Sequence, residues 1–320
     1  MNLKHFVLAI LATTLLTSTS INANAQNPNP PEKITANNVI EPYLLTPGGQ
    51  NETGTPSSTA IYRGRPAFAA EAPEAGGFEP WNKFGYYCRV TALGTKTVLI
   101  PTHCLFNVNR QPLDLTLYKV TFGSLSRSVI EPTEQIFGVK DPICYPGYNA
   151  NFADGLDLCI LSLTGTLRIG NGVMPAVLTS TAFLSSSEQL TQIVPFTDTK
   201  NQAYGDGINE TGGLSDIVNV TDLIPYSYIS STERGPQTTY CVIDSPPGGG
   251  DSGGVIKDKN GTTTGIISAY GQPTAGCNSV VLSPNLQFFW SWINETVSAK
   301  GDLLFKGFAN KLFLPLALVN

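Results

Sequence analysis

The sequence predicts a predominantly β-structured protein with one helix near its C-terminal end. Its 320 residues include 31 glycines and 23 prolines, and only 13% are charged. This composition favours short strands joined by turns over long surface helices, which need a charged face. Short runs rich in Val, Ile, Thr and Tyr, bounded by turn residues, predict strands that form a barrel or a sandwich. These runs are residues 86–92, 96–100, 117–122, 158–163, 238–243, 263–269 and 279–282.

The helix is predicted to begin at residues 283–284. Ser283 is a suitable N-cap, and Pro284 suits the first helical position. Apolar side chains then recur at helical spacing, at Leu286, Phe289, Trp290, Ile293 and Val297. We expect this face to pack on the β-structure and to carry no chemistry of its own.

The N-terminal segment predicts export. Lys4 precedes an apolar run from Phe6 to Leu16, and Ala23-Asn24-Ala25 has the small-x-small pattern of a signal-peptidase site. The alternative is a core helix, but it accounts neither for the lysine before the apolar run nor for the cleavage pattern after it. The run is too short to span a membrane. We interpret residues 1–25 as a signal peptide and expect a secreted protein, extracellular or periplasmic, with no membrane span.

Three regions follow the signal. Residues 26–60 are rich in Asn, Pro, Thr, Ser and Gly and predict a low-complexity spacer or pro-segment, because such a stretch buries too little apolar area to fold alone. Residues 61–298 predict the folded domain. Residues 299–320 form a C-terminal extension, and we expect its apolar side chains to dock on the domain rather than bind a partner.

Charge and cysteine content restrict the partners and cofactors. The formal net charge is −5 and no basic block is present, so nucleic acid is not an expected partner. Six cysteines in an exported chain predict disulfides. A zinc site is not expected, because no Cys-x-x-Cys spacing occurs and only one histidine follows the signal. We predict no metal and no cofactor, and the sequence does not indicate an oligomeric state.

The segment from Gly250 to Gly254, Gly-Asp-Ser-Gly-Gly, has the composition of a serine nucleophile in a tight turn. Serine is a poor nucleophile unless a base lies beside it. Glycines on both sides let the amides of Gly250 and Ser252 point into one small cavity, where they would stabilise an oxyanion. The alternative is a plain glycine-rich turn, since two further glycines precede the motif.

A base and a residue to orient it are both available. His103 ends an apolar strand and is the only histidine after the signal, so any histidine base is this residue. Asp157 opens the apolar run 158–163, where a buried carboxylate can accept from an imidazole and fix its tautomer. Asp154 is the competing aspartate, which we interpret as an exposed turn residue. The order His, Asp, Ser differs from that of other folds that use this triad.

These motifs together resemble the trypsin-like (chymotrypsin-fold) serine peptidase family. Thr102-His103-Cys104 resembles the family's Ala-Ala-His-Cys, residues 157–161 resemble its Asp-Ile-Ala-Leu-Leu, and residues 250–254 match its Gly-Asp-Ser-Gly-Gly. The resemblance implies two antiparallel β-barrels, about residues 61–172 and 173–298, with His103 and Asp157 in the first and Ser252 in the second. It also implies an acyl-enzyme mechanism and a protein or peptide substrate.

The resemblance further implies disulfide partners. It pairs Cys88 with Cys104 and Cys241 with Cys277, the second beside the substrate pocket. This leaves Cys144–Cys159, a pair that does not follow the family's usual pattern.

The specificity pocket departs from the family pattern. Cys241 lies 11 residues before Ser252, farther than in the family. Asp244 in the intervening segment is either the base of the pocket, favouring Arg or Lys, or an exposed turn residue. The resemblance places Ser268 in the pocket wall, and Tyr270 would narrow its entrance.

The family's activation signal is absent as well. Ile61-Tyr-Arg-Gly weakly resembles the mature start of the family. We predict cleavage after Ala60 and an ion pair between the new Ile61 ammonium and Asp251.

The function predicted from these residues is a secreted serine endopeptidase that is made as a zymogen. Two alternatives remain open. One is a non-catalytic binding homologue of the same fold, although such proteins usually lose a triad member. The other is an esterase that uses the same triad.

Overall fold

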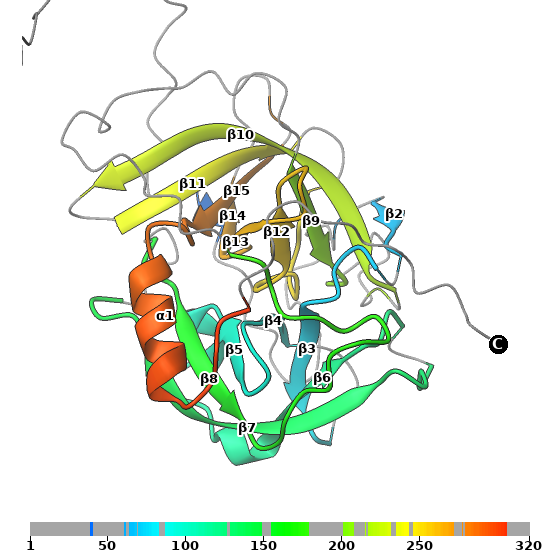
Figure 1. The fold of residues 1–320 in the computed structure, drawn as a ribbon. Coiled ribbons are helices and arrows are strands. Elements are labelled where there is room, and N and C mark those ends of the chain that lie inside the picture. Colours follow the sequence, from blue (N-terminus) through cyan, green and yellow to red (C-terminus); the bar gives the residue numbers. More distant parts are fainter. Residues whose placement is uncertain are drawn as a thin grey trace, which may run out of the picture. The chain divides into compact units, whose positions relative to one another are not determined.

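The structure is a computed structural model. It describes residues 39–40, 61, 64–68, 70–82, 87–126, 129–148, 155–178, 201–207, 215, 217–231, 235–242, 246–271, 277 and 279–305. Within them, strands dominate and one α-helix lies near the C-terminal end (Figure 1). The predicted fold class is confirmed.

Six antiparallel strands close into the first barrel, with each strand bonded to the next around the ring. In barrel order they are β3 (Ala75–Pro80), β4 (Cys88–Ala92), β5 (Thr97–Ile100), β8 (Cys159–Leu163), β7 (Gln135–Cys144) and β6 (Tyr118–Phe122). Closure leaves no exposed sheet edge in this barrel. Strands β3 and β7 were missed because glycine, proline and charged residues interrupt their apolar pattern.

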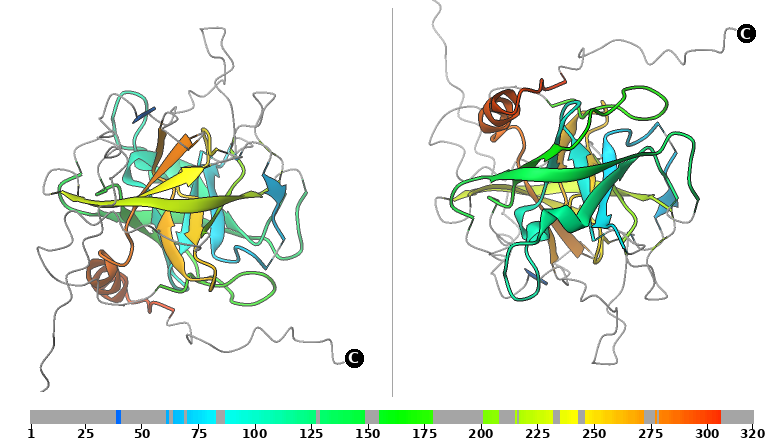
Figure 2. Two further views of the ribbon diagram at one scale, coloured as in Figure 1. Left: turned by 90° about the horizontal axis from the view of Figure 1, so that it is seen from above. Right: turned by 90° about the horizontal axis from the view of Figure 1, so that it is seen from below.

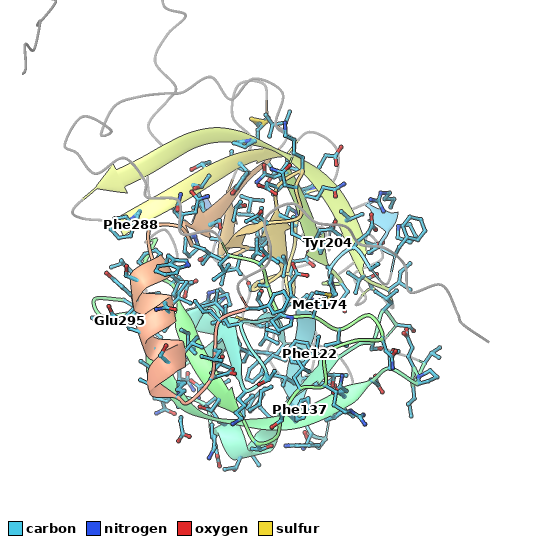
Figure 3. The ribbon with its side chains drawn as sticks, viewed as in Figure 1. Phe122, Phe137, Met174, Tyr204, Phe288 and Glu295 are labelled. Carbon is cyan, nitrogen blue, oxygen red and sulfur yellow. A yellow bond between two sulfur atoms is a disulfide. The ribbon has the colours of Figure 1, made fainter. Side chains whose placement is uncertain are left out.

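Strand β4 shows how the first barrel is built. Alternate side chains point to opposite faces of a strand, and Cys88, Val90 and Ala92 lie in the barrel core. Phe122 of β6 fills the same core (Figure 3). Arg89 therefore projects from the outer face of β4, and it is nevertheless 1% exposed. Its guanidinium contacts Asp206, and its backbone N–H donates to Ser252, both in loops between strands of the second sheet.

The second β-structure is a nine-stranded sheet that curls into a half-barrel (Figures 1 and 2). Its path is β1-β14-β15-β11-β10-β9-β12-β13, and β2 pairs with β10. These strands are β1 (Val39–Ile40), β2 (Arg65–Pro66), β9 (Asn201–Gly205), β10 (Asn219–Ser231), β11 (Gly235–Val242), β12 (Val255–Lys257), β13 (Thr263–Ile266), β14 (Ala269–Gly271) and β15 (Ser279–Pro284).

The predicted strand 263–269 is interrupted. Strand β13 ends at Ile266 and β14 begins at Ala269. Between them, Ile267 exchanges backbone hydrogen bonds with Gly253 and Gly254 instead of continuing a ladder. The break joins this part of the sheet directly to the serine motif.

The helix α1 (Trp290–Ala299) begins later than predicted. Ser283 and Pro284 are not its start but the end of β15, where they pair with Thr238 and Gln237 of β11. Sheet pairing therefore prevails over their capping preference. The apolar helix face was predicted correctly in part, since Ile293 and Val297 are buried in one cluster with residues of β5 and β8.

Three disulfides are present. Two are the pairs that the resemblance implied, and the third joins the two remaining cysteines. Cys88–Cys104 ties β4 to a short 3-10 helix (Thr102–Leu105), and Cys144–Cys159 ties β7 to β8. Cys241–Cys277 ties β11 to the segment before β15.

The chain after α1 docks on the first barrel at Asp302. This carboxylate accepts hydrogen bonds from the backbone of Thr95 and Lys96 and from the hydroxyl of Thr97. Burial alone would raise the pKa of Asp302, but these hydrogen bonds hold it below its ordinary value. The start of the C-terminal extension is thus fixed, and residues 306–320 lie outside the described part. In the part described, no helix is long and apolar enough to cross a membrane.

Candidate active site

His103 and Asp157 lie in direct contact, as predicted. His103 belongs to the 3-10 helix that follows β5, and Asp157 precedes β8 by two residues. The Nδ1 atom of His103 lies 2.6 Å from Oδ2 of Asp157, and the His103 backbone N–H donates to Oδ1 at 2.9 Å. An ionised carboxylate only accepts, so in the neutral ring Nδ1 carries the proton and Nε2 is the acceptor.

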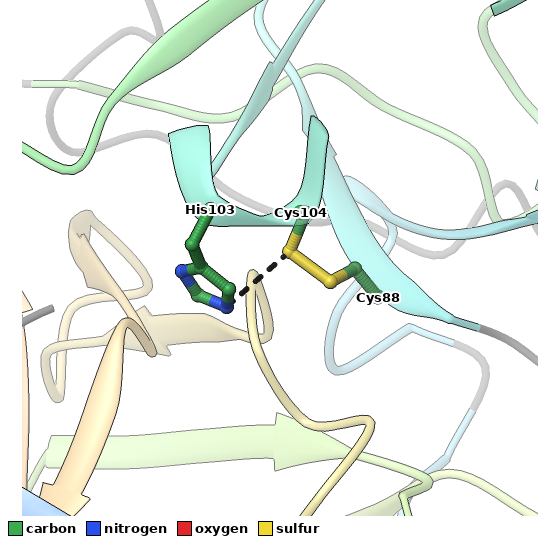
Figure 4. A group of neighbouring side chains, drawn as sticks. All are labelled: Cys88, His103 and Cys104. Carbon is green, nitrogen blue, oxygen red and sulfur yellow. Dashed lines mark hydrogen bonds between the residues drawn. A yellow bond between two sulfur atoms is a disulfide. The ribbon is translucent and has the colours of Figure 1, made fainter. Parts of the chain in front are cut away.

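The surroundings of His103 fix its ring. The imidazole is 4% exposed, and Nε2 lies 3.6 Å from Sγ of Cys104 (Figure 4). Potential ligand atoms of Cys88, His103 and Cys104 lie within 4.8 Å of one another. Zinc binds thiolates, and these two sulfurs are bonded to each other. The trio is therefore a disulfide beside a histidine, not a metal centre.

Asp157 has a second side-chain donor, Ser268. The hydroxyl of Ser268 donates to Oδ2 of Asp157 at 2.5 Å, and Asp157 is fully buried. A buried carboxylate is tolerated when donors surround it. The place of Ser268 in the wall of the specificity pocket stays a prediction, and the structure adds that its hydroxyl holds the aspartate. No motif around Ser268 indicates this contact, which joins the two β-structures.

The serine motif forms a tight turn. The N–H of Asp251 donates to the carbonyl of Gly248, and that of Gly254 to the carbonyl of Asp251. Gly250 and Gly253 have φ angles of 94° and 85°, which favour glycine. Among the described residues, no hydrogen bond is made by the N–H groups of Gly250 and Ser252. These are the two donors predicted for the oxyanion.

This turn packs against the histidine segment. The carbonyl of Ser252 accepts from the N–H of Arg89 at 2.7 Å. A Cβ atom on Gly253 would lie 1.9 Å from the Arg89 carbonyl oxygen and 3.0 Å from the ring of Pro101. Pro101 is two residues before His103, so these contacts bring the serine turn to the end of the first barrel that carries the histidine. Ser252 is 4% exposed.

Asp251 accepts from three backbone N–H groups. Its Oδ2 accepts from Ile61 at 3.0 Å and from Gly248 at 2.9 Å, and its Oδ1 accepts from Gly207 at 2.8 Å. Complete burial raises the pKa of Asp251 to about 6, against the lowering effect of these hydrogen bonds. The structure thus places the predicted partners Ile61 and Asp251 together, and Ile61 is 1% exposed.

An ion pair between Arg89 and Asp206 was not predicted. Nη1 of Arg89 lies 2.6 Å from Oδ1 of Asp206, and each side chain is 2% exposed. In the sequence, the position of Arg89 between core-facing Cys88 and Val90 indicates that this charge is buried. Asp206, between two glycines, reads as an ordinary turn residue.

Two of the predicted residues lie outside the described part of the chain, namely Asp244 and the competing Asp154. Tyr270 is described and lies in β14, where it is 7% exposed.

A comparison with known families gives an independent result. Residues 61–293 match the family model described as trypsin. The match covers well over half of the chain and contains every residue of the site described above.

Proposed function

The chain belongs to the trypsin family of serine peptidases, and from this premise we propose that it is a secreted serine endopeptidase with the triad His103, Asp157 and Ser252. The observation that carries the proposal is the hydrogen-bonded His103–Asp157 pair, next to which the serine turn is fastened.

The proposed mechanism has two half-reactions, acylation of Ser252 and hydrolysis of the acyl-enzyme, and both depend on the same three side chains. Nε2 of His103 takes the proton of the Ser252 hydroxyl as the serine oxygen attacks the carbonyl carbon of the substrate. Asp157 keeps the proton on Nδ1 and stabilises the imidazolium that forms. His103 then gives its proton to the leaving amine, which leaves an acyl-enzyme. Water, activated by the same nitrogen, hydrolyses this ester.

The oxyanion is assigned to the N–H groups of Gly250 and Ser252. They have no protein partner among the described residues, whereas their neighbours do. The loss of one such donor costs on the order of 3–4 kcal/mol in the transition state.

Activation is proposed to follow cleavage after Ala60. Before cleavage the nitrogen of Ile61 is an amide that already contacts Asp251. Cleavage would turn it into an ammonium and the contact into a buried ion pair. Removing one partner of a buried ion pair destabilises a protein by about 3–5 kcal/mol. A substitution of Asp251 in the cleaved chain would therefore disorder the serine turn.

The experiment that tests the proposal measures hydrolysis of a peptide library by the purified chain, cleaved after residue 60, and by Ser252→Ala and His103→Ala. We expect turnover that both substitutions abolish. Equal turnover by parent and variants would overturn the triad. Cleavage of aryl esters without cleavage of any peptide would favour the esterase, and no turnover of either would favour the binding homologue.

A further inference from the structure

A buried ion pair stands beside the catalytic turn without belonging to it. Removing two charges from water costs several kcal/mol per ion, so a buried pair is weak evidence for stability. Arg89 and Asp206 come from different β-structures, from β4 and from the loop after β9. A pair placed there calls for a role other than stabilising the fold.

Both partners are attached to the serine turn through their backbones. The N–H of Arg89 donates to the carbonyl of Ser252. The N–H of Gly207, the residue after Asp206, donates to the carboxylate of Asp251. The ion pair thus joins two segments that hold adjacent residues of the turn, Ser252 and Asp251.

The charges also match the activation step. Arg89 lowers the pKa of Asp251 and Asp206 raises it, so both act on this carboxylate. While they neutralise each other, Asp251 remains the carboxylate that a new Ile61 ammonium would meet. Without Asp206, the guanidinium would compete for Asp251. Without Arg89, a second buried carboxylate would stand beside it.

We propose that Arg89 and Asp206 are positioning residues that hold the Gly250 and Ser252 amides in the geometry needed for the oxyanion. This inference rests on the proposed function. It predicts an effect on the chemical step rather than on substrate binding.

The test uses Arg89→Met together with Asp206→Asn, which removes both charges and leaves neither one unpaired. We expect kcat to fall at least roughly tenfold with KM nearly unchanged, while the unfolding midpoint stays near that of the parent. The matched control is Lys257→Met with Glu74→Gln, another buried pair between the two β-structures, which should leave kcat unchanged. A double variant with the parent's kcat would overturn the proposal.

Hydrogen exchange gives a second readout that does not need activity. In a Ser252→Ala background, amides of residues 248–254 should exchange faster in the Arg89/Asp206 double variant and not in the control. Unchanged exchange would refute the positioning role even if the parent proved not to be a peptidase. A parent without turnover but with faster exchange in the double variant would instead count against the proposed function alone.

A separate observation concerns strand β1, in the predicted pro-segment. Val39 pairs with Gly271 and Ile40 with Tyr270, antiparallel to β14, at the end of the sheet. Strand β14 begins one residue after Ser268, whose hydroxyl holds Asp157. The edge that β1 covers therefore starts at the candidate active site, and an extended peptide would need the same backbone groups.

We infer that strand β1 is an intramolecular competitor for peptides at the β14 edge. A two-residue pairing is weak by itself, but a covalent tether gives it an effective concentration that can reach the millimolar range. Cleavage after Ala60 would remove the tether, so the segment would dissociate on dilution. This inference also rests on the proposed function.

The test compares the uncleaved parent with Ile40→Pro, which removes a backbone donor, and with Asn51→Pro as a control in the same segment. In a Ser252→Ala background, we expect faster exchange of whichever β14 amide, Tyr270 or Gly271, faces β1, and tighter binding of a fluorescent extended peptide, in the Ile40 variant only. Unchanged exchange would refute the contact. Faster exchange with unchanged peptide affinity would refute the competition.

Discussion

The hydroxyl of Ser268 and the imidazole of His103 donate to the same oxygen, Oδ2 of Asp157. The three residues come from three separate parts of the chain, and Asp157 is completely buried. The carboxylate is thus held on both sides, so the histidine ring meets a fixed acceptor. This arrangement predicts how the site responds to small changes.

Asp157→Asn should leave the fold intact and lower kcat by about 10⁴-fold, the loss known for this change in chymotrypsin. An amide in place of the carboxylate favours the wrong histidine tautomer. Steady-state kinetics with a peptide substrate measure the effect. A loss below tenfold would show that Asp157 does not orient the base.

Ser268→Ala should lower kcat about tenfold, because the carboxylate loses one of its donors while the His103 contact remains. A net buried hydrogen bond to a charged group is worth about 1.5–3 kcal/mol. The control is Ser283→Ala, a buried serine whose hydroxyl donates to the backbone carbonyl of the next residue. If both variants lose the same activity, the Ser268 contact has no specific role.

The charge on Asp251 predicts a pH dependence of the uncleaved chain. Its pKa is raised from about 3.8 to about 6 in the folded state, so the folded chain binds the proton more tightly than the unfolded chain. The free energy of unfolding should therefore decrease as the pH rises from about 4 to about 6, by an amount on the order of a few kcal/mol. Urea unfolding of Ser252→Ala measures it.

Asp251→Asn in the same background supplies the comparison, because all other titrating groups are shared. The difference in the free energy of unfolding between the two variants should depend on pH only between about pH 4 and about pH 6. After cleavage, the Ile61 ammonium lowers the pKa of Asp251, so the window should disappear. A difference that is independent of pH in the uncleaved chain contradicts the raised pKa.

The Cys144–Cys159 disulfide should contribute mainly to stability. It closes a loop with a sequence separation of 15, for which chain entropy gives about 3 kcal/mol. Replacing both cysteines by alanine should lower the unfolding midpoint and leave kcat within a few-fold. A large loss of kcat at temperatures where the variant is folded would show that the bridge positions Asp157, two residues away.

The parts of the site that were predicted are local in the sequence. His103, Asp157 and the serine turn each lie in a short motif whose composition indicates its chemistry, and the order of the motifs indicates the family. The helix face and most central strands follow from periodicity. The helix start was wrong because residues 283–284 take sheet partners far away in the chain.

The parts that were missed depend on contacts between the two β-structures. The Arg89–Asp206 pair and the Ser268–Asp157 contact exist only because strands far apart in sequence face each other. The place of Arg89 between two core-facing residues indicates a buried charge, but neither residue type nor spacing identifies the partner in either contact. The two-barrel fold itself was predicted and is confirmed, and only the strand order of its second, half-closed barrel depends on such long-range pairing.

The central claim is that Ser252 is the nucleophile, and covalent labelling tests it most directly. The chain cleaved after Ala60 is treated with a fluorophosphonate, and the adduct is located by peptide mass spectrometry. We expect one adduct, on Ser252, that is absent in His103→Ala and Ser252→Ala. An adduct on another residue, or labelling that persists in Ser252→Ala, would contradict the claim.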